Sequence, residues 1–245
     1  YFTYFFFHKR AISSLTLLAV LFFFSTTTLS QPRKMEEDTN NDGQIDQIAY
    51  FNENDELVQL EVDTSGDGKI DTRQYYAAGN LSSLHIDADH DGHFEVREYY
   101  QAGKRKKLEH LNSQGVTIRR LLLDDREQVM ELHQDTTGDG LLDSSYFYKD
   151  GELLRLTRDA DSNGTVELTV FFAADKPLRK EYDTDQDGVI ETMDFFSNGK
   201  IIRRVEDRNQ EGIGEKTTFY NSQGDIVKVT LRQQNKQDSL QIQYY

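Results

Sequence analysis

The sequence contains no cysteine, so the fold can hold neither disulfide bonds nor thiolate metal sites, and no lipid can be attached through a cysteine. Basic side chains are also in the minority, because 28 Lys and Arg stand against 43 Asp and Glu, for a formal net charge of −15. No basic stripe is visible along the chain. Since phosphate binding requires clustered positive charge, nucleic acid is not expected to be a partner.

Long apolar runs are absent beyond the N-terminal region, and the one found there is short. Three basic residues, His8 to Arg10, precede a nearly unbroken apolar stretch from Ala11 to Phe24, and small polar residues follow as far as Ser30. This order predicts a signal peptide over residues 1–30 with cleavage near Ser30, and a linker over 31–37. A spanning helix needs about 20 apolar residues, so membrane contact is expected only if this segment stays uncleaved. We expect a secreted, periplasmic or cell-surface protein.

The first methionine of the sequence is Met35. An alternative is therefore a cytosolic immunity or interaction protein whose translation begins at Met35. The succession of basic, apolar and polar residues before Met35 favours secretion, because unrelated upstream codons would seldom produce it in this order.

A nine-residue acidic loop recurs seven times between Asp38 and Glu215. Positions 1, 3, 5 and 9 of the loop carry mostly oxygen-bearing side chains, position 6 is always glycine, and position 9 is always an acid. The aspartates at position 1 are 25, 24, 48, 24, 24 and 24 residues apart, so one loop is missing from a 24-residue period. Such a period predicts a repeat protein in which each unit packs against its neighbours.

The loop spacing matches the coordination of Ca²⁺, which takes about six to eight oxygen ligands, here from positions 1, 3 and 5 and from the backbone carbonyl at position 7. The acid at position 9 would help to complete the shell. The candidate ligands of up to seven Ca²⁺ ions are Asp38, Asn40, Asp42, Gln44 and Asp46; Asp63, Ser65, Asp67, Lys69 and Asp71; Asp87, Asp89, Asp91, His93 and Glu95; Asp135, Thr137, Asp139, Leu141 and Asp143; Asp159, Asp161, Asn163, Thr165 and Glu167; Asp183, Asp185, Asp187, Val189 and Glu191; and Asp207, Asn209, Glu211, Ile213 and Glu215.

Loop composition predicts unequal affinities. The loops that start at Asp87 and Asp183 each have four carboxylates and should bind Ca²⁺ most tightly, whereas Glu211 at position 5 should make the last loop the weakest. His90 and His93 occupy positions that supply no side-chain ligand, so they are expected to face solvent. The alternative is that the loops are turns held by hydrogen bonds of their aspartate and asparagine side chains.

Two adjacent aromatic residues stand at positions 13 and 14 after each loop, as in Phe147-Tyr148. A glycine turn and a second apolar run follow, as in Asn198-Gly199 and residues 201–205. Aromatic and β-branched runs bounded by glycine turns predict strands, and no segment is long enough between turns for a helix. The protein is therefore expected to be all-β, with one β-hairpin in each 24-residue unit.

Eight hairpin units are expected over residues 38–230. The fourth lacks an acidic loop and has the turn Asn112-Ser113-Gln114-Gly115, whose sequence recurs at residues 221–224. Residues 231–245 predict a degenerate or truncated ninth unit. Because positions 13 and 14 point to opposite faces of a strand, aromatic side chains should pack across strands on both faces. We predict an extended, twisted antiparallel meander, with a closed β-propeller as the alternative.

The acidic loops resemble the EF-hand calcium loop, and more closely the helix-free loops of thrombospondin type 3 repeats and integrin-like propellers. A true EF-hand is excluded for nearly all units, because position 12 lacks its glutamate. The succession of acidic loop, aromatic pair, glycine turn and second strand is similar to bacterial secreted proteins with tandem β-hairpin repeats, and Phe195 to Ile201 is similar to membrane occupation and recognition nexus repeats. This resemblance covers roughly Asp38 to Thr230 and implies a calcium-stabilised scaffold without naming a ligand.

These features predict a secreted calcium-binding scaffold with a structural, adhesive or ligand-binding role and a protein or glycan partner. An enzyme is not expected, because cysteine is absent and the 6 histidines form no metalloprotease or hydrolase motif. A glycan-active enzyme is least favoured, since the repeat already explains the carboxylates that could imitate a glycosidase pair.

Mass spectrometry of the mature protein tests the interpretation of the N-terminus. We expect a mature chain that begins close to Ser30, because the small residues there suit a signal peptidase. A chain that begins at Met35 would contradict secretion.

Overall fold

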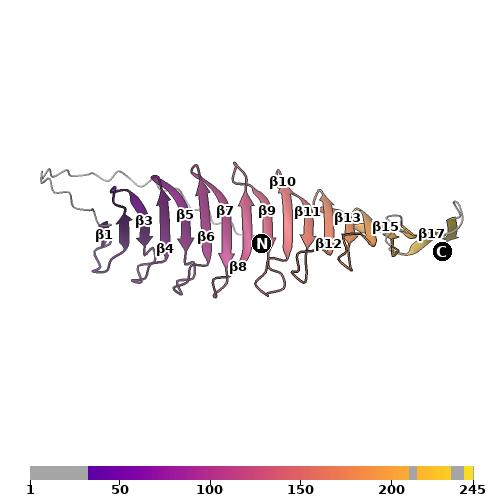
Figure 1. Ribbon diagram of the computed structural model, residues 1–245, viewed down its shortest axis with the longest axis horizontal. Coiled ribbons are helices and arrows are strands. Elements are labelled where there is room, and N and C mark those ends of the chain that lie inside the picture. The colour runs from indigo at the N-terminus through magenta and orange to yellow at the C-terminus, as the bar shows by residue number, and fades with distance from the viewer. Residues whose placement is uncertain (1–32, 210–213, 233–239, 245) are drawn as a thin grey trace.

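The computed structural model describes residues 33–209, 214–232 and 240–244. All regular elements in these residues are β-strands of one 18-stranded sheet (Figure 1). The strands are β1 (Arg33–Glu37), β2 (Gln47–Phe51), β3 (Leu57–Val62), β4 (Thr72–Ala77), β5 (Asn80–Ile86), β6 (Val96–Gln101), β7 (Lys104–Leu111), β8 (Thr117–Leu123), β9 (Val129–Gln134), β10 (Ser144–Lys149), β11 (Glu152–Arg158), β12 (Leu168–Ala173), β13 (Lys176–Tyr182), β14 (Thr192–Ser197), β15 (Lys200–Glu206), β16 (Lys216–Tyr220), β17 (Ile226–Arg232) and β18 (Leu240–Tyr244).

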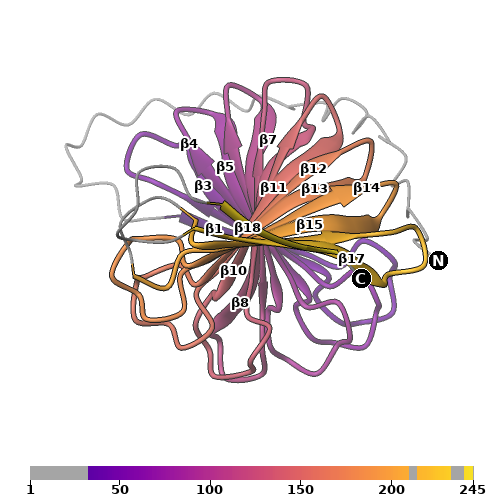
Figure 2. The ribbon, with the colours of Figure 1, turned by 90° about the vertical axis from the view of Figure 1, so that its right-hand side faces the viewer.

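Each strand pairs antiparallel with the strand before it and the strand after it in the chain, from β1–β2 at one end to β17–β18 at the other. The sheet is thus an open meander, which confirms the predicted fold and makes the closed propeller wrong. Viewed along the long axis, successive strands rotate steadily about it (Figure 2). This rotation is the usual strand twist accumulated over many strands without a second layer to limit it.

The connections alternate between the two long edges of the sheet, at which the strands end. The acidic loops lie at one long edge and the short hairpin turns at the other (Figure 1). Five of the short turns have two central residues with positive φ between 47° and 84°. They are Ala78-Gly79, Ala102-Gly103, Asp150-Gly151, Ala174-Asp175 and Asn198-Gly199. Two central residues with positive φ define the type I′ turn, whose twist suits a two-residue β-hairpin.

The turn that replaces the missing acidic loop is closed by an asparagine side chain. Asn112 Oδ1 accepts hydrogen bonds from the N–H groups of Gln114 and Val116, each at 3.0 Å. The repeated sequence forms the same arrangement around Asn221, with both hydrogen bonds at 2.9 Å, but at the opposite edge of the sheet. The turn therefore joins β7 to β8 with a register shift between His110 and Leu111, and the unit keeps both of its strands, as the sequence predicts.

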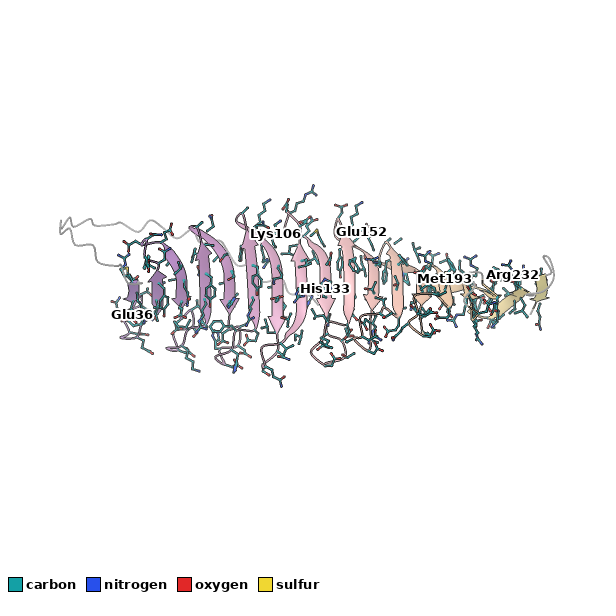
Figure 3. The ribbon with its side chains drawn as sticks, in the orientation of Figure 1. Glu36, Lys106, His133, Glu152, Met193 and Arg232 are labelled. Carbon is teal, nitrogen blue, oxygen red and sulfur yellow. The ribbon has the colours of Figure 1, made fainter. Side chains whose placement is uncertain are left out.

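The sheet has a very small apolar core. The buried apolar side chains of the described residues are Leu111, Leu123, Val170 and Val229, and none of the described side chains is completely enclosed. Side chains project from both faces, and no described element covers either face (Figure 3). Cross-strand contacts between neighbours must therefore supply most of the packing energy, as in other repeat proteins.

The middle of the sheet contains a continuous apolar row on one face. Its members are direct cross-strand neighbours on the six adjacent strands β7 to β12, namely Leu108, Leu121, Leu132, Tyr146, Leu156 and Val170. Beyond Val170 the row continues with Lys180 on β13 and then with Asp194 on β14 and Arg204 on β15, which form an ion pair. The central hairpins are thus linked by apolar contacts and the later ones by charge pairing.

Both ends of the described chain add strands to the array. β1 lies in the segment expected to be a linker and is the first strand of the sheet. Its Met35 pairs with Ala49 of β2. β18 lies in the expected ninth unit and pairs with β17. The signal-peptide prediction falls on residues 1–30, outside the described residues. No helix long and apolar enough to cross a membrane occurs in the described part of the chain.

The turn Ala174-Asp175 offers a test of the hairpin geometry, because it is the one type I′ turn of the five without glycine. Replacing it with Asn-Gly should raise the free energy of unfolding by about 1 kcal/mol, since positive φ is strained for alanine. The reciprocal change of Asn198-Gly199 to Ala-Asp should lower it by a similar amount. Urea unfolding of both variants provides the measurement, and a destabilised Asn-Gly variant would contradict the turn type.

Candidate metal centres

In the six acidic loops that the structure describes in full, the backbone coils around the carboxylate at position 1. Asp63 shows the pattern, because its Oδ1 accepts the N–H of Gly66 at 2.6 Å and its Oδ2 accepts the N–H of Gly68 at 2.7 Å. The side chain at position 5 accepts the N–H of position 7, as in Asp67 and Lys69 at 2.8 Å. These local hydrogen bonds explain why aspartate or asparagine is needed at both positions.

Positive φ explains the small and polar residues inside the loop. Position 4 has φ between 57° and 81° in the six loops whose position 4 is described, and it is occupied by Asn41, Gly66, His90, Gly138, Ser162 and Gln186. Gly68, at position 6, has φ +85°, and a Cβ there would lie 2.3 Å from Gln44 Oε1 of the preceding loop. Glycine at position 6 therefore serves the turn, and at Gly68 a Cβ would in addition require the Gln44 side chain to move.

The loops are joined to one another by backbone hydrogen bonds. The N–H at position 1 donates to the carbonyl at position 9 of the preceding loop, at 2.8 Å for Asp63 to Asp46 and for Asp87 to Asp71. Where the loop is missing, the N–H of Leu111 makes the equivalent bond to Glu95 at 2.7 Å. The loops thus form an ordered row along one edge.

This row contains the most deeply buried acids of the protein. Asp71 and Asp87 are each 2 % exposed and Asp143 is 3 % exposed, which is less than any apolar residue in the described part of the chain. Burial of a charge is costly unless it is paired or hydrogen-bonded. The loops therefore do more than connect strands.

Three of the loops bring their carboxylates together. Within the described residues, acidic groups whose ligand atoms all lie within 4.8 Å of one another are Asp87, Asp89, Asp91 and Glu95; Asp183, Asp185, Asp187 and Glu191; and Asp159, Asp161 and Glu167. All three groups have glutamate at position 9. The two four-carboxylate loops singled out by the sequence are among them.

The loops with aspartate at position 9 use that carboxylate differently. Asp71 accepts the hydroxyl of Thr64 at 2.7 Å and the N–H of Ser65 at 3.0 Å, and so both of its oxygens are engaged. Asp143 and Asp46 are held in the same way by a threonine at position 2. Hydrogen bonds close these three loops, in agreement with the alternative interpretation that the acidic loops are turns held by their own side chains.

Glutamate at position 9 leaves one carboxylate oxygen available. Glu95 Oε2 accepts the N–H of Ala88 at 3.0 Å, and Glu191 Oε2 accepts that of Thr184 at 2.6 Å. The Oε1 atoms of both glutamates are buried and have no hydrogen-bond partner in the described structure. The additional methylene therefore lets one oxygen close the loop while the other remains in the acidic group.

The group at Asp183 meets a physical test for a cation site. Asp183 is 4 % exposed, and its Oδ1 has no hydrogen-bond partner among the described residues. A buried, unpaired carboxylate oxygen is expensive. Because Asp187 and Glu191 belong to the same group, a hard cation would satisfy oxygens that no donor in the described part of the chain reaches.

Contacts between loops involve residues that the sequence did not single out. Gln186, at position 4, donates to Asp161 Oδ2 at 3.0 Å and to Glu167 Oε1 at 2.9 Å in the preceding loop. Its side-chain amide thus lies against the acidic group at Asp159, and its oxygen accepts a hydrogen bond from the Asn163 side chain of the same loop. The signal in the sequence was a long side-chain amide at position 4, where three other loops have Gly66, Gly138 and Ser162.

The two histidines of the third loop also contact acids. His90 Nδ1 lies 3.3 Å from Asp71 Oδ2 of the preceding loop, although the His90 side chain is 46 % exposed. His93 Nδ1 lies 3.0 Å from Asp91 Oδ1, and its side chain is 64 % exposed. Both are therefore partly solvent-facing, but each has an acidic neighbour that the spacing alone did not predict.

The remaining predicted ligands are placed as follows. At position 7, Gln44, His93, Leu141, Thr165 and Val189 donate their N–H groups to position 5, as Lys69 does. In the last loop, Asp207 is 3 % exposed and its Oδ1 has no partner among the described residues. Glu211 and Ile213 of that loop lie outside the described residues, so the prediction that it binds most weakly stays a prediction.

Hydrogen bonds keep several loop acids ionised. Burial opposes ionisation of Asp143, but hydrogen bonds from Ser144 and Thr136 outweigh it and lower its pKa to about 2. The Thr39 hydroxyl lowers the pKa of Asp46. The amide of Gln186 is the main cause of a lowered pKa at Asp161. Asp143, Asp46 and Asp161 are therefore carboxylates, rather than carboxylic acids, at neutral pH.

Comparison with models of protein families and with curated proteins gives no match. Among solved structures, the chain is similar to accessory secretory protein 1, 2 and 3 of Streptococcus pneumoniae, with 17 % identity over 45 % of this chain and 20 % of that one and a TM-score of 0.35. A GtfA/B complex bound to UDP and GlcNAc gives 17 % identity, 41 % and 22 % coverage, and a TM-score of 0.33. A porin-like protein from Bacteroides uniformis gives 12 % identity, 89 % and 96 % coverage, and a TM-score of 0.22.

The chain spans about a fifth of the length of the first two structures. At these low TM-scores the similarities support no inference about function. The proposals below rest on the geometry of this chain.

The pKa of Asp143 leads to a prediction about acid stability. Because its folded pKa of about 2 lies below the ordinary aspartate value of 3.8, its contribution to stability is fully present above about pH 4 and is lost as the pH falls through 2. Thr136→Val should lower the free energy of unfolding by about 1–2 kcal/mol at neutral pH and by less at about pH 2. Urea unfolding at both pH values provides the measurement.

Thr137→Val is the matched control, because its hydroxyl contacts Asp135, at 3.4 Å, and not Asp143. It should change the unfolding free energy little at either pH. Equal effects of the two variants at both pH values would contradict the assignment of the low pKa to the Thr136 contact.

Proposed function

We propose that this protein is a non-catalytic, secreted repeat scaffold that Ca²⁺ stiffens along one edge. The buried, unpaired oxygen of Asp183 within a group of four acids is the observation that carries the proposal. The group at Asp87 provides a second site of the same design, with the buried, unpaired Oε1 of Glu95. The group at Asp159 provides a third site with three acids, two of which accept hydrogen bonds from Gln186. The loops at Asp38, Asp63 and Asp135 are closed by their own hydrogen bonds and would depend less on the ion.

Calcium is the cation that the ligand chemistry favours. The three groups offer carboxylate oxygens, with no cysteine in the chain and no histidine in any group. Hard oxygen ligands suit Ca²⁺ or Mg²⁺ and are a poor set for zinc. Calcium is preferred because it accepts the irregular geometry of a flexible loop, whereas Mg²⁺ demands a small, regular octahedron.

A stiffening role follows from the small core of the sheet. A single layer with few buried apolar side chains gains little energy from burial, so ligands that bind only the folded state can contribute a large share of stability. A cation would also reduce repulsion among the acids of its loop. The cations would lie along one edge of an array whose described elements are all strands. Their proposed role is therefore to make the array rigid, and not to sense calcium by moving helices.

Secretion agrees with this role. Extracellular calcium modules commonly bind with submillimolar to millimolar affinity, and low cytosolic calcium would leave such sites empty. The basic, apolar and polar order of residues 8–30 supports the same compartment. Neither argument depends on the other.

Thermal unfolding with Ca²⁺ and with a chelator tests the proposal. A site at a calcium concentration 100 times its Kd adds about 2.7 kcal/mol to the free energy of unfolding, so we expect a clear rise in Tm with Ca²⁺. Titration calorimetry should give about three tighter sites, in line with the three acidic groups. An unchanged Tm together with a stoichiometry near zero would overturn the proposal.

A matched pair of variants locates the sites. Asp187 and Asp139 occupy position 5 of their loops, and each accepts the N–H of position 7 at 2.8 Å. Asp187→Asn should weaken one site at least about tenfold, because it removes one of four carboxylates, whereas Asp139→Asn should leave the three tighter sites unchanged. The reverse order of effects in the calcium titration would show that the acidic groups were assigned to the wrong loops.

A further inference from the structure

A row of alternating aromatic and basic residues crosses one face of the sheet from β10 to β18. Its members are direct cross-strand partners, so their side chains share one face. The Phe–Arg row consists of Phe147, Arg155, Phe171, Arg179, Phe195, Arg203, Phe219, Lys228 and Tyr244. Every second strand thus presents a cation at the same height of the sheet.

The cations of the row are held in place by the rings beside them. The guanidinium carbons of Arg155, Arg179 and Arg203 lie 4.1, 4.4 and 3.9 Å from the centres of the rings that precede them in the row. Lys228 lies 5.4 Å from the ring of Phe219 and 5.7 Å from that of Tyr244. Such contacts leave the outer N–H groups of a guanidinium able to bind an anion, and they reduce the entropy that binding would cost.

This face is locally basic although the whole chain is acidic. Arg179 has an ion pair with Glu181 at 3.0 Å, whereas none of the ion pairs among the described residues involves Arg155 or Arg203. The strand register adds further lysines to the same face near the hairpin turns, at Lys149, Lys176 and Lys200. The surface therefore complements an anion.

The row is confined to the second half of the sheet. At the same height, β2 to β6 carry Tyr50, Gln59, Tyr75, Ser83 and Tyr99, which are neutral, and isolated cations stand at Lys34 on β1 and Lys107 on β7. Leu122 and Glu131 on β8 and β9 interrupt the alternation before Phe147. The repeat does not require arginine at this position, so its regular use from β11 to β15 needs a separate explanation.

We propose that the Phe–Arg row binds an extended acidic polysaccharide, with its acidic groups paired to Arg155, Arg179 and Arg203. Alternate strands place successive cations roughly 10 Å apart, and one sugar advances an extended chain by about one strand spacing. The row therefore fits a polymer with an acidic group on every second sugar. This inference does not depend on calcium binding, because the row lies on the strands and not in the acidic loops.

Exposed aliphatic side chains favour a sugar polymer further. Leu154, Leu178 and Ile202 directly precede the three arginines and are 40 %, 49 % and 44 % exposed. Each stands at the register shift between the two strands of its hairpin. They give the surface an apolar component that the C–H groups of sugars can contact, and that a purely charged ligand would not use.

Other anionic polymers fit the spacing less well. A nucleic acid strand carries a phosphate about every 3.4 Å along a B-form axis, so only a minority of its charges would meet a cation. Its bases would also compete with the guanidiniums that already cover the rings. An extended peptide repeats its side chains on one face about every 6.8 Å, which falls out of step with the row.

Calorimetric titration of the full-length protein in Ca²⁺ with a hyaluronan oligosaccharide tests the proposal, because every second sugar of this probe has a carboxylate. We expect measurable binding and no binding of neutral cellohexaose. The variant Arg155→Gln, Arg179→Gln, Arg203→Gln should weaken binding at least about tenfold, through the loss of three charge-assisted hydrogen-bonding groups. The single variant Arg155→Gln, at an exposed site, should weaken hyaluronan binding about threefold. It replaces the triple variant in the test if the triple variant does not fold.

The matched control is Arg126→Gln, Arg158→Gln, Lys180→Gln, which removes the same charge from a turn and from the opposite face. It should keep hyaluronan affinity within about threefold of the wild type. The proposal is overturned if hyaluronan does not bind, if the row and control variants lose affinity equally, or if poly(dT) or polyglutamate binds more tightly. The proposal is also overturned if a chelator abolishes hyaluronan binding while the triple Arg→Gln variant of the Phe–Arg row keeps full affinity. That result would assign the polymer to the acidic loops.

Discussion

The hydrogen bonds from backbone N–H groups to the carboxylate at position 1 of the described acidic loops are the interaction on which the regularity of this protein depends. Asp63 and its equivalents wind the loop around themselves, and their N–H groups join each loop to the previous one. A one-layer sheet has no second layer to align its hairpins. The aligned loops take over part of that task, and they place the most buried atoms of the molecule at an edge.

One methylene group divides the loops into two kinds. Aspartate at position 9, as in Asp71, is fully occupied by hydrogen bonds to position 2 and 3, whereas glutamate, as in Glu191, leaves an oxygen in the acidic group. The same repeat therefore yields loops that are complete in themselves and loops that favour a cation. This difference lets a repeat protein vary its ion dependence along the array without changing its strands.

The edge and the faces of the sheet can serve separate purposes because strand residues alternate between faces. The acidic loops are confined to one edge, while the Phe–Arg row occupies one face of the second half. A negative edge and a basic face coexist in a chain with a net charge of −15 because they are kept apart by the sheet itself. Neither surface requires a cavity, in keeping with a layer whose side chains are mostly half exposed.

The sequence by itself determined the 24-residue period, the hairpins, the missing loop and the two richest acidic groups, because loop chemistry and turn chemistry act over a few neighbouring residues. Only the tertiary structure decided that the sheet stays open, that Gln186 reaches the loop of Asp161, and that Arg155 lies between Phe147 and Phe171. The sequence showed no basic stripe, since these cations are 24 residues apart. Register across strands, together with the shift in each hairpin, aligns them, and register is a property of paired strands and not of any single segment.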